Sequence, residues 1–312
     1  MTVAAVSSPA PAAMAAGPCE RAPAPGSFSG SYVSGGFNRR VIVHVPPAVA
    51  GRALPVVLAL AGANQSSEFF ERYTGLSALA DGEQFIAVYP TATGLHPLWT
   101  INDDHPGAAN DVVFLSGLLD GIGQRLCVDP SRIYSLGVSN GGGMTARLAC
   151  ELSGRIAAVV SVAGGYRSLP PCHPDVPVSV LEIHGTADPD VRYLGSGGGG
   201  PGAVGPFLSG WAARNGCRAR PRRRRVGVAL LRLDWTGCRL GADVSHIEVF
   251  GGGHQLPGGL PHDRGPRSTF SAVWEAWRFL RAHARAPGPY ALPATPYTLP
   301  RRPGARRTDR RR

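Results

Sequence analysis

Short apolar runs alternate with helical stretches through most of this 312-residue chain, and this order constrains the fold more than any other feature. Run 55–60 is continuously apolar, as expected for a central strand that is covered on both faces. The alternation predicts an α/β fold, with a mostly parallel central sheet and helices on both faces. Strands are predicted at 39–45, 55–60, 85–89, 133–138, 156–162, 178–183 and 247–250, and helices at 66–79, 111–126, 141–152 and 269–284.

The sequence predicts one folded domain, residues 31–285, between two segments of a different composition. Residues 1–30 are rich in Ala and Pro and are predicted to be a leader or a disordered N-terminal segment. They lack a basic n-region, which is typical of a weak or truncated signal peptide at most. Residues 286–312 are rich in Pro and Arg and are predicted to be a disordered tail. Residues 195–205 have a GGGG core and are predicted to form a flexible loop.

The basic charge of the chain is concentrated in two places. The formal net charge is +11, and segments 218–225 and 301–312 carry +6 each, so the rest of the chain carries −1. This distribution argues against a surface-wide platform for nucleic acid or membrane. The Arg run at 222–225 is predicted to lie in a variable loop. No apolar run approaches the ~18 residues of a membrane span, so none is predicted.

The six cysteines show none of the spacings of a zinc site, so no metal is predicted. Two interpretations remain open from the residues alone. The cysteines are buried thiols of a cytosolic protein, or they form up to three disulfides in an exported one. Their even number favours disulfides. The cysteines are Cys19, Cys127, Cys150, Cys172, Cys217 and Cys238.

A G-x-S-x-G motif at residues 137–141 is the strongest signal for chemistry. The predicted strand 133–138 leads directly into it, and the predicted helix 141–152 follows. In such a strand–turn–helix unit, small flanking residues allow a strained serine to project its hydroxyl at the edge of a sheet. Ser139 is therefore the predicted nucleophile.

A nucleophilic serine needs a base, and this type of turn predicts the chain order serine, acid, histidine. Asp188 follows strand 178–183, and His254 follows strand 247–250 after three glycines. Both therefore lie at the sheet edge where open α/β sheets bind ligands. Asp190 is the alternative acid, and His184 is interpreted as a structural residue.

The sequence resembles the secreted esterases of the polyhydroxybutyrate depolymerase and feruloyl esterase type, within the α/β-hydrolase superfamily. The resemblance covers about residues 31–284. The segments that carry it are PVVLALAG (55–62), FIAVYPT (85–91), DVVFLSGLLD (111–120), VDPSRIYSLGVSNGGGMTARLAC (128–150), HGTADPDV (184–191), WAARNGC (211–217) and GGGHQLPG (251–258).

The resemblance implies a role for each candidate residue. Ser139 forms the acyl-enzyme, His254 is the general base, and Asp188 orients His254. The backbone N–H of Asn140 and that of Ala63 are the expected oxyanion donors. The resemblance also implies disulfide pairs, which are Cys150–Cys172, Cys217–Cys238 and, from the two cysteines left over, Cys19–Cys127.

Two segments depart from the family pattern. Ala61 stands before the glycine of the oxyanion loop, where the family usually has His, and this change affects the expected loop geometry. Gln255 and Leu256 stand where relatives often have Thr and Trp, which removes an aromatic wall near the base and affects substrate preference.

The sequence thus predicts a secreted serine carboxylic-ester hydrolase without metal or organic cofactor, acting on feruloyl or other acyl esters of polysaccharides. A polyhydroxybutyrate depolymerase or oligomer hydrolase is the alternative enzyme. The predicted partner of this protein is a small-molecule or oligomeric ester substrate, and no nucleic-acid partner is predicted. A non-catalytic basic binding protein is the alternative from another class, but no aromatic residues are interleaved with the Arg runs. A third hypothesis is a catalytically inactive relative, suggested by Ala61.

Overall fold

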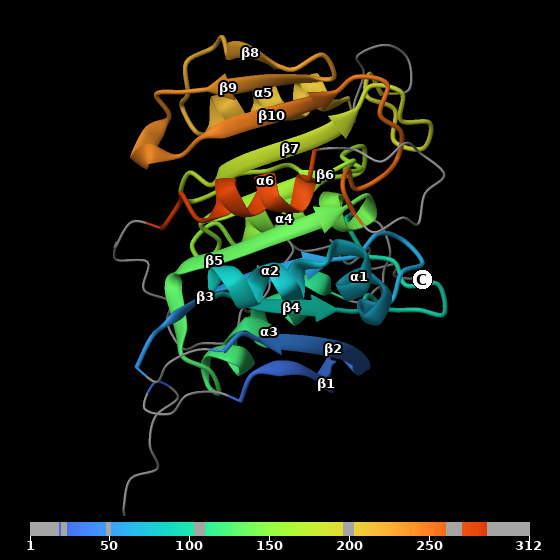
Figure 1. Ribbon diagram of the computed structural model, residues 1–312, viewed down its shortest axis with the longest axis vertical. Coiled ribbons are helices and arrows are strands. Elements are labelled where there is room, and N and C mark those ends of the chain that lie inside the picture. The colour runs from blue at the N-terminus through green and yellow to red at the C-terminus, as the bar shows by residue number, and fades with distance from the viewer. Residues whose placement is uncertain are drawn as a thin grey trace, which may run out of the picture.

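The described residues form a single mixed sheet of ten strands (Figure 1). The computed structural model describes residues 19, 24–47, 51–102, 110–195, 203–259 and 270–285. The strand order is β1-β2-β4-β3-β5-β6-β7-β10-β9-β8, with parallel pairs from β4 to β10 and antiparallel pairs at both edges. The strands are β1 (Gly26–Ser34), β2 (Phe37–Val45), β3 (Leu54–Leu60), β4 (Ile86–Pro90), β5 (Val128–Val138), β6 (Ala158–Val162), β7 (Ser179–Gly185), β8 (Arg222–Val226), β9 (Leu230–Trp235) and β10 (Val244–Val249).

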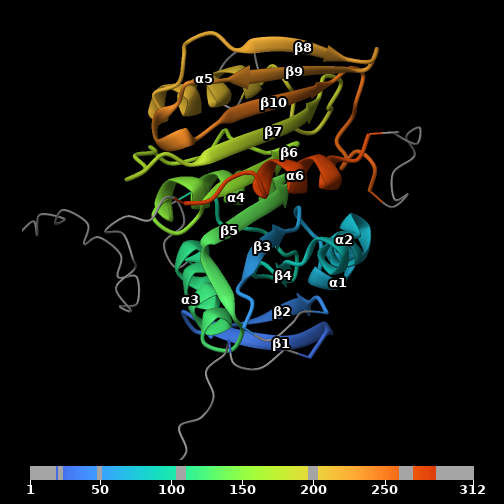
Figure 2. The same ribbon diagram turned by 60° about the vertical axis from the view of Figure 1, so that its left-hand side comes forward.

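Helices cover both faces of this sheet. Helices α3, α4 and α5 pack on one face, and α1, α2 and α6 pack on the other. Figure 2 shows α3 and α5 on one side of the strands and α1 and α2 on the opposite side. The helices are α1 (Ser67–Thr74), α2 (Leu76–Glu83), α3 (Asp111–Gly123), α4 (Asn140–Glu151), α5 (Val204–Arg214) and α6 (Ala272–Leu280), with a 3-10 turn η1 at Arg239–Gly241.

The two apolar cores follow from the two-residue period of a strand. In β3, Leu58 belongs to the core under α3 and α4, and its neighbour Val57 belongs to the core under α1 and α6. Every residue of β3 is buried, which is why its sequence is continuously apolar rather than alternating. The predicted doubly covered parallel sheet is confirmed.

The predicted helix 66–79 is two helices. Gly75 has a φ of 62°, ends α1 through a hydrogen bond from its N–H to the Glu71 carbonyl, and begins α2. A left-handed φ is favourable for glycine because it has no Cβ, so the break occurs at this residue. Ser66 caps α1 by accepting a hydrogen bond from the Phe69 N–H at 3.2 Å.

Five elements are absent from the sequence prediction: β1, α5, β8, β9 and the 3-10 turn η1. The predicted loop for the Arg run was wrong, because residues 222–225 lie in β8, an edge strand paired antiparallel with β9. Every β8 residue is exposed, so it has no apolar period to signal a strand. The predicted domain start at residue 31 lies inside β1, which begins at Gly26 and is also mostly exposed.

Several predicted segments lie outside the described residues. They are residues 1–18 and 20–23 of the predicted leader, residues 196–202 of the Gly-rich loop, and the tail 286–312. Within the described part of the chain, no helix is long and apolar enough to cross a bilayer.

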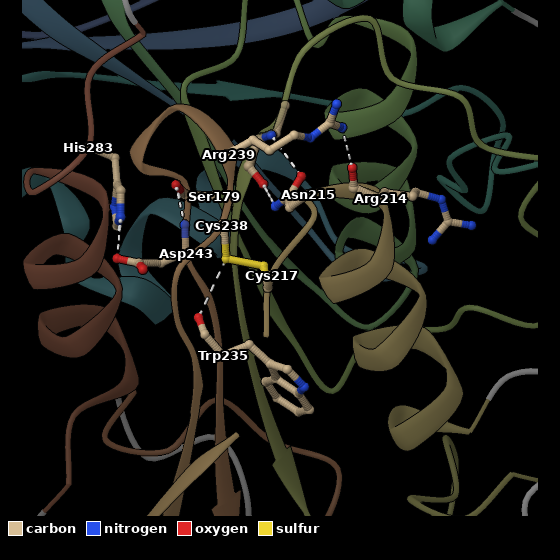
Figure 3. The surroundings of a disulfide bond; sticks show 10 residues. Ser179, Arg214, Asn215, Cys217, Trp235, Cys238, Arg239, Asp243 and His283 are labelled. Carbon is tan, nitrogen blue, oxygen red and sulfur yellow. Dashed lines mark hydrogen bonds and ion pairs between the residues drawn. A yellow bond between two sulfur atoms is a disulfide. The ribbon is translucent and has the colours of Figure 1, made fainter. Parts of the chain in front are cut away.

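Three disulfides join the six cysteines in the predicted pairs. They are Cys19–Cys127, Cys150–Cys172 and Cys217–Cys238. Figure 3 shows the third, which links the residues after α5 to those after β9, beside Trp235. Close to it, the Arg239 guanidinium donates a hydrogen bond to the Arg214 carbonyl at 2.7 Å. The disulfides thus join segments that are distant in the sequence at three places on the domain.

Candidate active site

Ser139 occupies a strained turn between β5 and α4. Its φ is 56° and its ψ is −120°, a backbone conformation that residues with a side chain rarely adopt. Two hydrogen bonds hold the turn: the Ser139 N–H donates to the Val162 carbonyl at 2.9 Å, and the Gly143 N–H donates to the Ser139 carbonyl at 3.0 Å. The strain therefore persists because β6 and α4 fix the backbone on both sides.

The glycines of the motif are required by close backbone packing. A Cβ on Gly137 would collide with the carbonyl of Gly141, and a Cβ on Gly141 would collide with the carbonyl of Leu60. A Cβ on Gly142 would lie 2.6 Å from Ser161 Oγ. Gly141 of the motif thus allows the turn to pack closely against β3, and the following Gly142 allows it to pack against β6.

The loops after β7 and β10 bring the predicted acid and base to Ser139. His254 Nε2 lies 2.9 Å from Ser139 Oγ, and His254 Nδ1 lies 2.8 Å from Asp188 Oδ2. The two loops are joined, because the Ala187 N–H donates to the Gly252 carbonyl at 2.9 Å and Gly185 has no Cβ to separate them. Residues separated by up to 115 positions thus form one continuous hydrogen-bonded chain.

Asp188, and not the alternative Asp190, occupies the position beside His254. The Asp188 side chain is fully buried, and its Oδ1 accepts hydrogen bonds from the N–H groups of Asp190 and Val191 at 2.9 and 2.8 Å. Asp190 is exposed. Burial by itself raises the pKa of Asp188, but hydrogen bonds from His184, His254 and Val191 hold that pKa well below its usual range. The carboxylate is therefore ionised at neutral pH.

The predicted oxyanion donors are the N–H groups of Asn140, which follows Ser139 in the chain, and of Ala63, in the loop after β3. Asn140 is the first residue of α4, so its N–H has no acceptor within the helix. This N–H lies at the N-terminus of α4, which is the positive end of the helix dipole. Ala63 follows Gly62, and a Cβ built on Gly62 would lie 3.4 Å from Ser139 Cβ. The loop after β3 thus runs directly beside the serine.

Trp99 fixes this loop to the serine turn, a role that the sequence prediction missed. Its indole N–H donates to the Ala61 carbonyl at 3.0 Å. Its backbone N–H donates to Asn140 Oδ1 at 2.7 Å, and its carbonyl accepts from Asn140 Nδ2 at 3.1 Å. Trp99 lies 41 positions from Asn140, so no local pattern identifies it.

The two departures from the family pattern have structural counterparts. Ala61 is buried at the end of β3, where its carbonyl accepts the Trp99 hydrogen bond. Leu256 is also buried, in the core under α1 and α6, and its N–H donates to the Tyr73 hydroxyl at 3.0 Å. Leu256 therefore anchors the chain after His254 to α1.

A second layer of polar side chains lies behind Asp188. Glu182 and His184 of β7 and His246 of β10 are buried at 1% exposure or less, and they contact one another through ring nitrogens and carboxylate oxygens. His184 also lies 3.3 Å from Asp188 Oδ2. No group of three or more His, Cys, Asp or Glu side chains in the described ranges has the arrangement of a metal site.

Comparison with known proteins places this geometry in a family. Residues 40–169 match the family model described as Esterase PHB depolymerase. The chain is 32% identical over 253 residues to the putative esterase NocK of Nocardia uniformis subsp. tsuyamanensis, an alignment that covers 73% of each protein. It is 31% identical to feruloyl esterase B of Piromyces equi over 69% of this chain, but spans only 42% of that protein.

Solved structures agree on the fold. An acetyl xylan esterase from Aspergillus awamori superposes with a TM-score of 0.60 over 75% of this chain and 94% of that one, at 15% identity. A thermostable esterase superposes with a TM-score of 0.53 over 83% of this chain and 63% of that one, at 16% identity. The chain therefore has the α/β-hydrolase fold, belongs to the Esterase PHB depolymerase family, and is a carboxylic-ester hydrolase.

Proposed function

We propose that this protein is a serine esterase in which Ser139 is the nucleophile, His254 the general base and Asp188 the acid that orients the base. The observation that carries the proposal is the hydrogen-bonded chain from Asp188 Oδ2 through His254 to Ser139 Oγ, at 2.8 and 2.9 Å. A free serine hydroxyl is a weak nucleophile at neutral pH, and a base within hydrogen-bond reach removes that limitation.

The first half of the reaction forms an acyl-enzyme. Ser139 Oγ bonds to the ester carbonyl carbon while its proton moves to His254 Nε2. Asp188 accepts the hydrogen bond from His254 Nδ1 and stabilises the imidazolium. The carbonyl oxygen becomes an oxyanion, and the N–H groups of Asn140 and Ala63 bind it. His254 then gives its proton to the alcohol oxygen, and the C–O bond of the ester breaks.

The second half repeats these steps with water. His254 takes a proton from the water molecule while the water oxygen bonds to the acyl carbon. The tetrahedral intermediate collapses, Ser139 Oγ leaves and regains the proton from His254, and the carboxylic acid is released. The cycle balances with side chains and water alone, so the proposal includes neither a metal nor an organic cofactor.

We assign feruloyl or related acyl esters of plant polysaccharides as the substrate class. The similarity to feruloyl esterase B of Piromyces equi and to feruloyl esterase D of Neurospora crassa supports this assignment. Hydroxybutyrate oligomers are the second candidate, supported by the description of the matching family model. The proposed partner is a small-molecule or oligomeric ester, and nucleic acid has no part in the proposal.

The three disulfides support an extracellular location, because such bonds persist in oxidising compartments. Secretion would also bring the enzyme to polymeric esters, which do not enter cells.

Replacement of Ser139 by Ala tests the nucleophile. With p-nitrophenyl acetate, methyl ferulate and hydroxybutyrate oligomers as substrates, we expect Ser139→Ala to lower kcat by at least about 10,000-fold. Ser209→Ala is the matched control, because Ser209 is exposed on α5 and its hydroxyl bonds only the nearby Pro206 carbonyl among the described residues. Equal activity of wild type and Ser139→Ala would contradict the nucleophile assignment. No activity in the wild type with any of these esters would favour a binding protein.

A further inference from the structure

Behind Asp188, a buried carboxylate and a buried imidazole continue the chain of contacts into the core. Glu182 and His184 are two positions apart on β7, so their side chains lie on the same face of the sheet. His184 Nδ1 lies 2.7 Å from Glu182 Oε1, and His184 Nε2 lies 3.3 Å from Asp188 Oδ2. All three side chains have zero solvent exposure. His184 therefore joins one interior carboxylate to the carboxylate of the site.

The hydrogen-bond partners of His184 define its protonation state. Its Nδ1 faces a Glu182 carboxylate oxygen, and its Nε2 faces the Val191 carbonyl at 2.8 Å as well as Asp188 Oδ2. Carbonyl and carboxylate oxygens only accept hydrogen bonds, so both ring nitrogens must donate. A neutral imidazole has one N–H, whereas an imidazolium has two. With Glu182 ionised, the geometry thus requires a cationic His184.

Every group packed around His184 is compatible with this charge. The facing groups are Glu182 from β7 and, from the loop after β7, Asp188, Val191 and the Tyr193 ring, which meets the imidazole edge-on at 5.9 Å. Glu182 in turn accepts from the Tyr166 hydroxyl at 3.1 Å and lies 2.7 Å from His246 Nδ1. His246 Nε2 lies 2.9 Å from the Tyr193 hydroxyl.

The electrostatics agree with the geometry. Burial by itself lowers the pKa of His184, but the charge of Glu182 and hydrogen bonds to Asp188 and Glu182 raise that pKa to about 10. Burial by itself raises the pKa of Glu182, but the charge of His184 and its hydrogen bond lower that pKa to about 2. An isolated charge at either position would cost several kcal/mol in desolvation, so each ion depends on the other.

We propose that His184 is a positioning residue for Asp188, and that Glu182 keeps it in the imidazolium form. Asp188 Oδ2 is then held between two histidines, with His254 toward the substrate and His184 toward the core. His184 fixes the orientation of this oxygen and withdraws part of its negative charge. The inference rests on the proposed roles of Ser139, His254 and Asp188.

This role differs from simple filling of the interior. A residue that only fills space affects stability, whereas a positioning residue affects the chemical step without weakening substrate binding. Glu182 lies on the far side of the His184 ring from Asp188, so the nearer cation dominates the electrostatic field at the Asp188 carboxylate.

The protonation state can be measured without any change in the buried cluster. We expect the imidazole ¹⁵N spectrum of Ser139→Ala at pH 8 to show both His184 nitrogens protonated, with the His184→Gln spectrum identifying the signals. A neutral His184 tautomer at pH 8 would overturn the proposal. Because this readout needs no turnover, it stands apart from the activity test of Ser139.

The functional effect is tested by Glu182→Gln combined with His184→Gln, which removes both charges together and leaves no buried ion unpaired. We expect kcat to fall roughly tenfold with little change in KM. Tyr166→Phe is the control, because it removes a neutral donor from the same Glu182 oxygen and should leave kcat near the wild-type value. A kcat of the double variant equal to that of the wild type would contradict the proposal. If the double variant does not fold, the ¹⁵N measurement decides.

Discussion

Two strands of the same sheet carry charge in opposite ways. β7 is buried along its whole length and contains Glu182 and His184, which are in contact with each other. β8 is exposed along its whole length and contains four consecutive arginines. Within the described residues, none of these four forms an ion pair, and Arg225 lies 5.2 Å from the ring centroid of Phe250.

The difference shows that position, and not the amount of charge, decides what a charged residue does. The four arginines of β8 contribute +4 to the formal net charge of +11, yet each is exposed to solvent, where salt screens its charge. Glu182 and the proposed His184 cation have opposite charges in a low dielectric, where their interaction is much stronger than it would be at the surface.

Replacement of the buried acid is expected to have the largest effect. Asp188→Asn should lower kcat/KM by about 10,000-fold with little change in fold, because the amide no longer stabilises the imidazolium and favours the wrong His254 tautomer. Steady-state kinetics on methyl ferulate, with circular dichroism as the check on folding, measure this effect. Asp190→Asn is the matched control, since Asp190 is exposed only two positions away. A comparable loss in both variants would contradict the assignment of Asp188.

The ion pair on β7 should also set how stability depends on pH. The pKa of His184 is about 10 in the folded protein and near 6.5 in the unfolded chain, so protonation of His184 stabilises the fold. This stabilisation is complete below about pH 6.5 and is lost as the pH rises toward about 10. The pKa of Glu182 is about 2 in the folded protein and near 4.5 in the unfolded chain, so ionisation of Glu182 stabilises the fold. This stabilisation is complete above about pH 4.5 and is lost as the pH falls toward about 2. The contribution of the pair is therefore largest between about pH 4.5 and 6.5.

Urea unfolding of the wild type and of the Glu182→Gln and His184→Gln double variant at a series of pH values measures this contribution. We expect the difference in the free energy of unfolding to be greatest in that window and to shrink on both sides of it. A difference that stays constant from pH 5 to pH 9 would show that His184 does not titrate between the folded and unfolded states as proposed.

The same contrast between buried and exposed strands explains how much of the fold the sequence could predict. The continuously apolar run of β3 was assigned correctly because burial on both faces leaves a local signature. β1 and β8 were missed because an exposed edge strand forms its hydrogen bonds through the backbone alone. Gly75 divides a predicted helix because its left-handed φ depends on the packing of two helices, which no periodicity shows.

The candidate site follows the same rule. Ser139 was predicted from a local turn, and Asp188 and His254 were predicted because each follows a strand at the same edge of the sheet; the structure brings the three side chains into contact. Trp99 was missed because its contacts with Ala61 and Asn140 span about 40 residues. Glu182 was not predicted as part of the site, although the sequence contains a signal for it. A carboxylate inside an otherwise apolar strand requires a partner, and His184 is two positions away.

The exposed arginines are expected to have the smallest effect. We consider a triple variant that combines Arg222→Gln, Arg223→Gln and Arg224→Gln. Each substitution should change the free energy of unfolding by no more than about 0.5 kcal/mol, and kcat/KM on methyl ferulate should stay unchanged. Arg225 is kept because it contacts Phe250, which precedes the His254 loop. Charged side chains on an edge strand oppose pairing with another chain, so the variant should self-associate more readily in sedimentation velocity at equal concentration. A loss of activity without self-association would instead place the arginines in substrate binding.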